Sequence, residues 1–141
     1  MPSDYLIDLA RGLVISRAWG VLTDDDLLGR ARTLAHDPRI RPDMRQLSDF
    51  REITELKVHS ATIREMVALS PFGTGARRAV IVGSDASYGM ARMYQLLQDT
   101  TPESVDVYRE LEPALAWLEL TDAAAEVSAA LGSARSIPGS G

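Results

Sequence analysis

The sequence predicts an α/β fold with a mixed, mostly parallel five-stranded sheet, in the order strand, strand, helix, strand, helix, strand, helix, strand, helix, with one more helix at the end. Two observations support this prediction. Short segments in which apolar and polar residues alternate are separated by longer segments with apolar residues at helical spacing. One short segment, Ala79–Val82, is apolar on both faces, as the central strand of a parallel sheet should be.

The composition is that of a single globular domain. The chain has 141 residues, 45% hydrophobic and 25% charged, which excludes a disordered or low-complexity protein. The absence of Cys excludes disulfides and a thiolate metal site. A net charge of -5 argues against nucleic acid as a partner. No apolar run approaches the ~20 residues of a membrane span, and the N-terminus does not resemble a signal peptide, so we expect a cytoplasmic protein.

The first two strands are expected to form a hairpin. They are predicted over 5–9 and 13–19, and the short turn Arg11-Gly12 between them allows only antiparallel pairing. The first helix begins after Thr23, a typical N-cap, and three Asp residues in its first turn complement the helix dipole. Two prolines shortly after residue 36 end this helix.

Strands and helices then alternate. We expect strands over 45–50, 79–82 and 105–108, and helices over 60–69, 87–98 and 110–120. Apolar residues recur at three- and four-residue spacing in each of these helices. An Ala-rich segment predicts a terminal helix that Gly132 ends, followed by a frayed tail over 133–141. The chain therefore divides into a domain over 1–120 and a terminal helix with a flexible tail over 121–141.

The two faces of the predicted sheet differ in polarity. Outside the central strand, each strand places a polar residue on one side; these residues are Asp8, Ser16, Ser48 and Asp106. Helices on both faces would favour apolar strands throughout, so we infer that most helices cover one face. The other, less apolar face is then partly open, or is covered by the terminal helix or by a second subunit. A homodimer is one expectation that follows.

Five short motifs carry a family resemblance. They are Ala18-Trp19-Gly20, Leu47-Ser48-Asp49-Phe50-Arg51, Arg78-Ala79-Val80-Ile81-Val82, Gly89-Met90-Ala91-Arg92-Met93-Tyr94 and the segment 108–118. In this order they resemble the SpoIIAA-like superfamily, which holds the STAS domains and a bacterial branch labelled STAS/SEC-fourteen-like. The resemblance implies a sheet with helices mainly on one side. It also implies action by docking to proteins or by binding small ligands rather than by catalysis.

The resemblance also implies a modification site. In the anti-sigma antagonists of this superfamily, a kinase phosphorylates a Ser at the start of the second helix, within an Asp-Ser-Ser motif. Ser60 is the nearest counterpart here, although the acidic-serine motif is absent. The residues alone favour Ser60 as a helix cap worth about 1 kcal/mol. Phosphorylation of Ser60, or ligand binding by Ser60 with His59, is the alternative.

A second candidate site lies where the central strand ends. The loop after this strand enters a helix, and ligands of open α/β sheets collect at such an edge. The polar residues of this loop are Ser84, Asp85 and Ser87. They should lie near Asp49, because their strands are expected to be neighbours. Gly89 would let the helix approach the sheet closely. Asp85 and Ser87 either cap this helix or form a small polar pocket or partner-docking rim.

Catalysis has little support in the sequence. The two His lack metal-ligand spacing, and no Gly-x-Ser-x-Gly motif is present. The arginines near the third strand alternate with aspartates, which favours a solvated mixed-charge surface over a nucleic-acid site. We therefore expect a non-catalytic interaction or ligand-binding module, regulatory in kind, with no cofactor and no metal. The alternative is a carrier of a small apolar molecule or lipid, which the branch's likeness to CRAL-TRIO domains implies and which needs an apolar pocket. A small enzyme ranks third.

Overall fold

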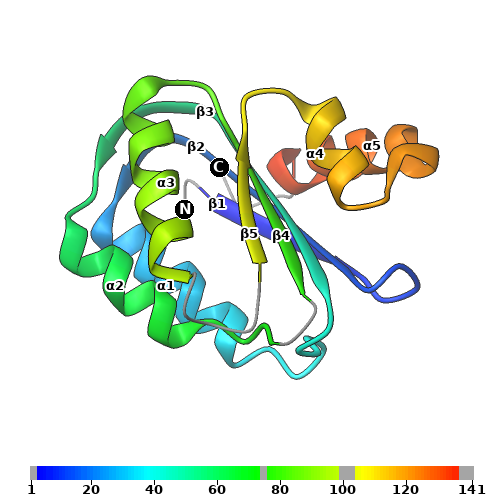
Figure 1. Ribbon diagram of the computed structural model, residues 1–141, viewed down its shortest axis with the longest axis horizontal. Coiled ribbons are helices and arrows are strands. Elements are labelled where there is room, and N and C mark those ends of the chain that lie inside the picture. The colour runs from blue at the N-terminus through cyan, green and yellow to red at the C-terminus, as the bar shows by residue number, and fades with distance from the viewer. Residues whose placement is uncertain (1–2, 74–75, 99–103, 137–141) are drawn as a thin grey trace.

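The computed structural model describes residues 3–73, 76–98 and 104–136. These residues form one five-stranded sheet in the order β1-β2-β3-β4-β5, with helices packed against it (Figure 1). The strands are β1 (Ser3–Asp8), β2 (Leu13–Thr23), β3 (Arg45–Lys57), β4 (Arg77–Val82) and β5 (Ser104–Tyr108). The helices are α1 (Asp24–Ala35), α2 (Ser60–Leu69), α3 (Asp85–Gln98), α4 (Leu111–Trp117), the 3-10 turn η1 (Thr121–Ala123) and α5 (Ala124–Ser136). The predicted fold class and element order are confirmed.

The strand pairing explains where the first three helices lie. β1 and β2 form the predicted antiparallel hairpin, and every later pair of neighbouring strands is parallel. Strands β2, β3 and β4 each pair with the next strand along the chain, so all three crossovers step in the same direction. Since parallel crossovers are right-handed, α1, α2 and α3 must lie on the same face. Figure 1 shows this arrangement.

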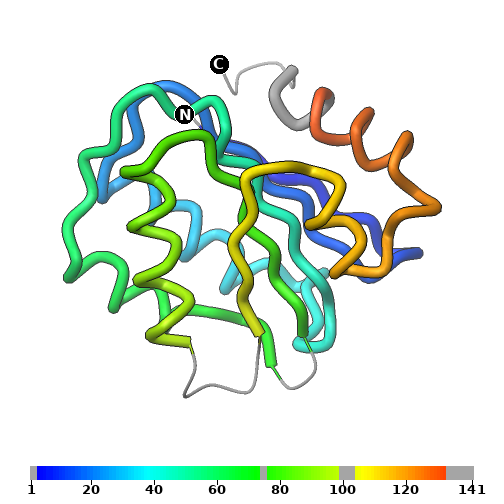
Figure 2. Tube along the Cα trace, turned by 45° about the horizontal axis from the view of Figure 1, so that its top comes forward, coloured from blue at the N-terminus to red at the C-terminus, as the bar shows by residue number. Residues whose placement is uncertain are grey.

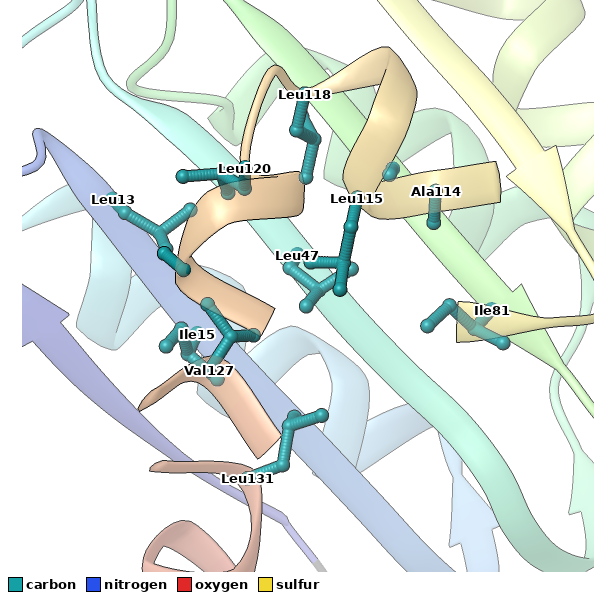
Figure 3. Packing of buried hydrophobic residues seen from close by; sticks show 12 residues of the cluster. Leu13, Ile15, Leu47, Ile81, Ala114, Leu115, Leu118, Leu120, Val127 and Leu131 are labelled. Atoms are coloured by element: carbon teal, nitrogen blue, oxygen red, sulfur yellow. The ribbon is translucent and has the colours of Figure 1, made fainter. Parts of the chain in front are cut away.

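The chain after β5 covers the opposite face. Figures 1 and 2 both show α4 and α5 on the side of the sheet away from α1, α2 and α3. Leu115 and Leu118 pack there with Leu47, while Val127 and Leu131 of α5 belong to the same core cluster as Ile15 (Figure 3). The terminal helix therefore provides the cover that the second face needs. Within the described residues, the reason for expecting a second subunit no longer applies.

The polar residues expected on the less covered face divide between the two faces. Asp8 and Asp106 stand beside Leu13 and Ala79 on the face that α4, η1 and α5 cover. Ser16, Gln46, Ser48 and Arg78 lie on the face that carries the three crossover helices. The expectation that these polar residues share the less covered face was wrong for Ser16 and Ser48. Buried polar side chains are stable when they bond to one another, and on this face they do so.

Several element ends differ from the prediction. Residues 51–58 were expected to form a loop. Residues 51–57 instead continue β3 and pair with an equally extended β2, from Trp19 opposite Glu52 to Thr23 opposite Lys57. Helix α3 begins at Asp85, two residues earlier than predicted, and α4 is shorter than predicted. Helix α5 continues through Gly132, which was expected to end it, and includes residues 133–136 of the predicted tail. Residues 137–141 lie outside the described residues.

Candidate functional site

The end of β4, which lies beside the middle of β3, brings two of the predicted regions together. Phe50 pairs with Val82, so the β4–α3 turn lies beside the residues that follow Asp49, as expected. The close approach depends on Gly83, because a Cβ there would stand 2.6 Å from the carbonyl oxygen of Arg51. Gly89 was expected to have this role, but nothing lies within 4 Å of a Cβ at that position.

Asp49 is buried and fully engaged by its own strand. Its side chain is 2% exposed. Arg51 donates to both carboxylate oxygens, from Nε to Oδ1 and from Nη2 to Oδ2, each at 2.9 Å. The backbone N–H of Arg51 donates to Oδ1 at 3.0 Å. These bonds raise the pKa of Arg51 and keep the pair together. Asp49 therefore holds Arg51 in place within β3 and offers little to a ligand.

The polar residues of the β4–α3 loop do not converge on a pocket. Ser84 caps α3, because its Oγ accepts a hydrogen bond from the backbone N–H of Ser87 at 3.1 Å. Asp85, expected to be a cap, is exposed and accepts from Nη2 of Arg109 at 2.8 Å. Ser87, the other expected cap, is buried at 1% exposure. A residue of this loop does cap α3, as expected, but it is Ser84 rather than Asp85 or Ser87.

The start of α2 is capped from another helix. Ser60 was expected to be the N-cap, but the N-cap is His59, whose side chain makes no cap bond. Asp24 of α1 accepts hydrogen bonds from the backbone N–H of His59 at 2.8 Å and from its Nδ1 at 2.6 Å. The backbone bond and then the side-chain bond lower the pKa of Asp24 to about 2. Ser60 is exposed in the first turn, where a phosphate would add negative charge beside a position that Asp24 already occupies.

A cavity that sequence reasoning missed lies between the sheet and the three crossover helices. Its volume is about 90 Å³. The apolar part of its wall comes from all three helices and includes Leu27, Ile63, Met66 and Met90. The sheet contributes a polar strip, which we define as Ser16, Gln46, Ser48 and Arg78. Gln46 and Ser48 lie on either side of Leu47 in β3, so they share one face of the sheet. This two-residue spacing is the sequence signal of a polar strip on one face.

Three residues of the polar strip, Ser16, Gln46 and Arg78, form a connected hydrogen-bond network. Nε2 of Gln46 donates to Oγ of Ser16 at 2.9 Å, and Nε of Arg78 donates to Oε1 of Gln46 at 2.9 Å. Nη1 of Arg78 reaches the hydroxyl of Tyr94 on α3 at 2.5 Å. The guanidinium also lies 4.7 Å from the centre of the Phe72 ring. The network therefore crosses three strands and orients polar groups along one wall of an otherwise apolar cavity.

Residues 3–73, 76–98 and 104–136 contain no group of three or more His, Asp or Glu side chains that could hold a metal ion. In that part of the chain, no helix has both the length and the apolar content needed to cross a lipid bilayer.

Comparison with solved structures supports the fold. The chain matches the crystal structure of an uncharacterized protein from the DUF3478 family with a SpoIIAA-like fold, from Shewanella loihica PV-4. The TM-score is 0.55 at 21% sequence identity, and the match covers 82% of this chain and 93% of that chain. The chain has a SpoIIAA-like fold. The resemblance drawn from its motifs is thereby confirmed at the level of the fold. Neither a model of a protein family nor a curated protein matches the sequence.

Proposed function

We propose that this SpoIIAA-like protein is a non-catalytic module that binds a small ligand in the cavity between the polar strip and helices α1, α2 and α3. The hydrogen-bonded strip on one wall of an apolar cavity is the observation that supports this function. Small-molecule sites in proteins typically combine apolar walls with a few polar groups that fix the ligand's orientation. This cavity has both features.

The size of the cavity constrains the ligand. One water molecule needs roughly 10–15 Å³ of such volume, so about 90 Å³ accommodates roughly six to nine groups of that size. The ligand is therefore a small amphipathic molecule, with its apolar part against Ile63 and Met66 and its polar part toward Gln46. Pockets for larger organic ligands typically measure about 300–1,000 Å³, which disfavours the alternative of a lipid carrier.

The side chains around the cavity support binding rather than catalysis. The described lining holds no histidine that could act as a base beside the serine hydroxyls. Asp26, an acid in the lining, accepts hydrogen bonds from the backbone N–H and the hydroxyl of Thr23 in the capping box that begins α1. Its role is therefore to start that helix.

Native mass spectrometry of the gently purified protein tests the proposal. We expect the wild type to carry a small-molecule adduct. Ala31 lies on α1 in the cavity wall, so Ala31→Leu should fill part of the cavity and remove the adduct. Ala116→Leu is the matched control, because Ala116 is exposed on α4 on the opposite face and its substitution should leave the adduct in place.

Three results would count against this function. A wild-type protein of bare mass would show that no ligand is retained, and an adduct that survives in Ala31→Leu would place the ligand elsewhere. A partner protein that co-purifies in place of a small molecule would favour the interaction module over the ligand-binding one.

A further inference from the structure

We infer a second binding site, for a small multivalent oxyanion such as a phosphate ester, in a cleft that lies at the opposite edge of the sheet from the β4–α3 loop. The arginine cleft is defined by Arg11, Arg41, Arg45 and Arg77. It is open, polar and about 480 Å³ in volume. It lies where β3 and β4 begin, between the β1–β2 turn and the end of α4. The inference does not depend on the cavity behind the polar strip.

Two of these arginines are held in fixed orientations by neutral acceptors. Arg45 donates from Nη1 to the carbonyl oxygen of Leu118 and from Nη2 to that of Arg11, each at 2.6 Å. Arg77 donates from Nη1 to the carbonyl oxygen of Trp117 at 2.7 Å and stacks over its ring. Within residues 3–73, 76–98 and 104–136, neither arginine forms an ion pair with a carboxylate. Their positive charges are therefore directed into the cleft without neutralisation.

The other two arginines stand at the rim. Arg11 is paired with Asp8 at 2.7 Å. Arg41 lies 3.6 Å from Asp43, and because both side chains are more than half exposed this pair is weak. Arg41 is thus available to turn toward a bound anion. Its guanidinium lies close to the β1–β2 turn, since a Cβ at Gly12 would stand 3.6 Å from Nη2 of Arg41.

The charge and chemistry of the arginine cleft favour a multivalent oxyanion. Four arginines line it against two acidic residues, Asp43 and Glu119, although the whole chain has a net charge of -5. The planar N–H fork of a guanidinium matches the oxygen spacing of phosphate and carboxylate groups. The volume is in the range of small-molecule sites, and the polar lining disfavours an apolar ligand.

Calorimetric titration with pyrophosphate at constant ionic strength tests the inference. We expect saturable binding that Arg41→Gln weakens by roughly two- to tenfold, because one charged contact at an exposed site is lost. Glu119→Gln should strengthen binding, because it removes a repulsive carboxylate from the lining. Arg32→Gln is the matched control, since it removes one exposed arginine from α1 on the other side of the sheet. It should change the affinity by less than about twofold.

Arg45 and Arg77 are left intact in this design because they bind α4, and their loss could unfold the protein. The inference is overturned if pyrophosphate shows no saturable binding, or if Arg41→Gln and Glu119→Gln leave the affinity unchanged. It is also overturned if Arg32→Gln weakens binding as much as Arg41→Gln, because the effect would then reflect net charge alone. Circular dichroism of each variant confirms that the fold is retained.

Discussion

Gly83 should be one of the least replaceable residues at the carboxyl edge of the sheet. A Cβ at this position would stand 2.6 Å from the carbonyl oxygen, 3.1 Å from the Cα and 3.2 Å from the carbonyl carbon of Arg51. All three atoms belong to the backbone of β3, which cannot rotate away as a flexible side chain could. Gly83→Ala therefore forces β3 and the β4–α3 turn apart, next to the Asp49–Arg51 pair.

The size of the effect follows from two opposing terms. Overpacking of this kind costs about 1–3 kcal/mol, and contact with backbone places the cost near 3 kcal/mol. The lower entropy of the unfolded chain offsets about 0.4–1 kcal/mol of it. We therefore expect Gly83→Ala to lower the free energy of unfolding by about 2 kcal/mol. Gly89 is the matched comparison. It lies inside α3 with nothing within 4 Å, so Gly89→Ala should raise the free energy of unfolding by about 1 kcal/mol.

Urea denaturation of the wild type and the two variants measures both changes. The account predicts midpoints on opposite sides of the wild type, with the two variants separated by about 3 kcal/mol. A Gly83→Ala variant at least as stable as the wild type would refute the reasoning about the turn. A destabilised Gly89→Ala variant would show that α3 packs more tightly on the sheet than the structure indicates.

Three further predictions concern the core, the polar strip and the cap of α2. Leu115→Ala should lower the free energy of unfolding by about 2–5 kcal/mol, since Leu115 is buried between α4 and the sheet. A loss below about 1 kcal/mol in a urea titration would contradict this packing. Gln46→Leu should lower the free energy of unfolding by about 1–3 kcal/mol, because the partner groups on Ser16 and Arg78 lose hydrogen bonds. Unchanged stability in the same urea titration would argue against the network. The Asp24 carboxyl should titrate near pH 2 when followed by NMR. Its contribution to stability is therefore complete above its ordinary pKa of 3.8 and is lost as the pH falls toward 2. A titration midpoint near 3.8 would exclude the hydrogen bonds from His59.

Local patterns in the sequence predicted the elements that depend on local chemistry. The hairpin followed from a turn too short for a crossover, and the start of α1 followed from Thr23 as a typical N-cap with acidic residues in the next turn. Strand β4 followed from its two apolar faces, and Ala79 and Ile81 are indeed buried. It has a neighbour on each side, but the middle strand of the sheet is β3. The terminal helix was one of two covers considered for the second face, and it lies there together with α4.

The predictions that failed concern contacts between distant segments. Asp24 caps α2 across 35 residues of sequence, which no local pattern encodes. The extension of β3 depends on pairing with the equally extended β2, and its polar residues alone suggested a loop. The face of Gln46 and Ser48 could not be assigned from the sequence. Right-handed crossovers that step in one direction place α1, α2 and α3 on one face, but the handedness does not decide which alternating set of side chains points to that face.

The proposed function depends on a small ligand in the cavity beside the polar strip. A high-resolution crystal structure of the wild type, purified without detergent or added small molecules, tests this directly. We expect continuous non-protein density between Gln46 and Met66, larger than a single water and bonded to the strip. A cavity closed by its own side chains, or one that holds only separate waters, would contradict the claim.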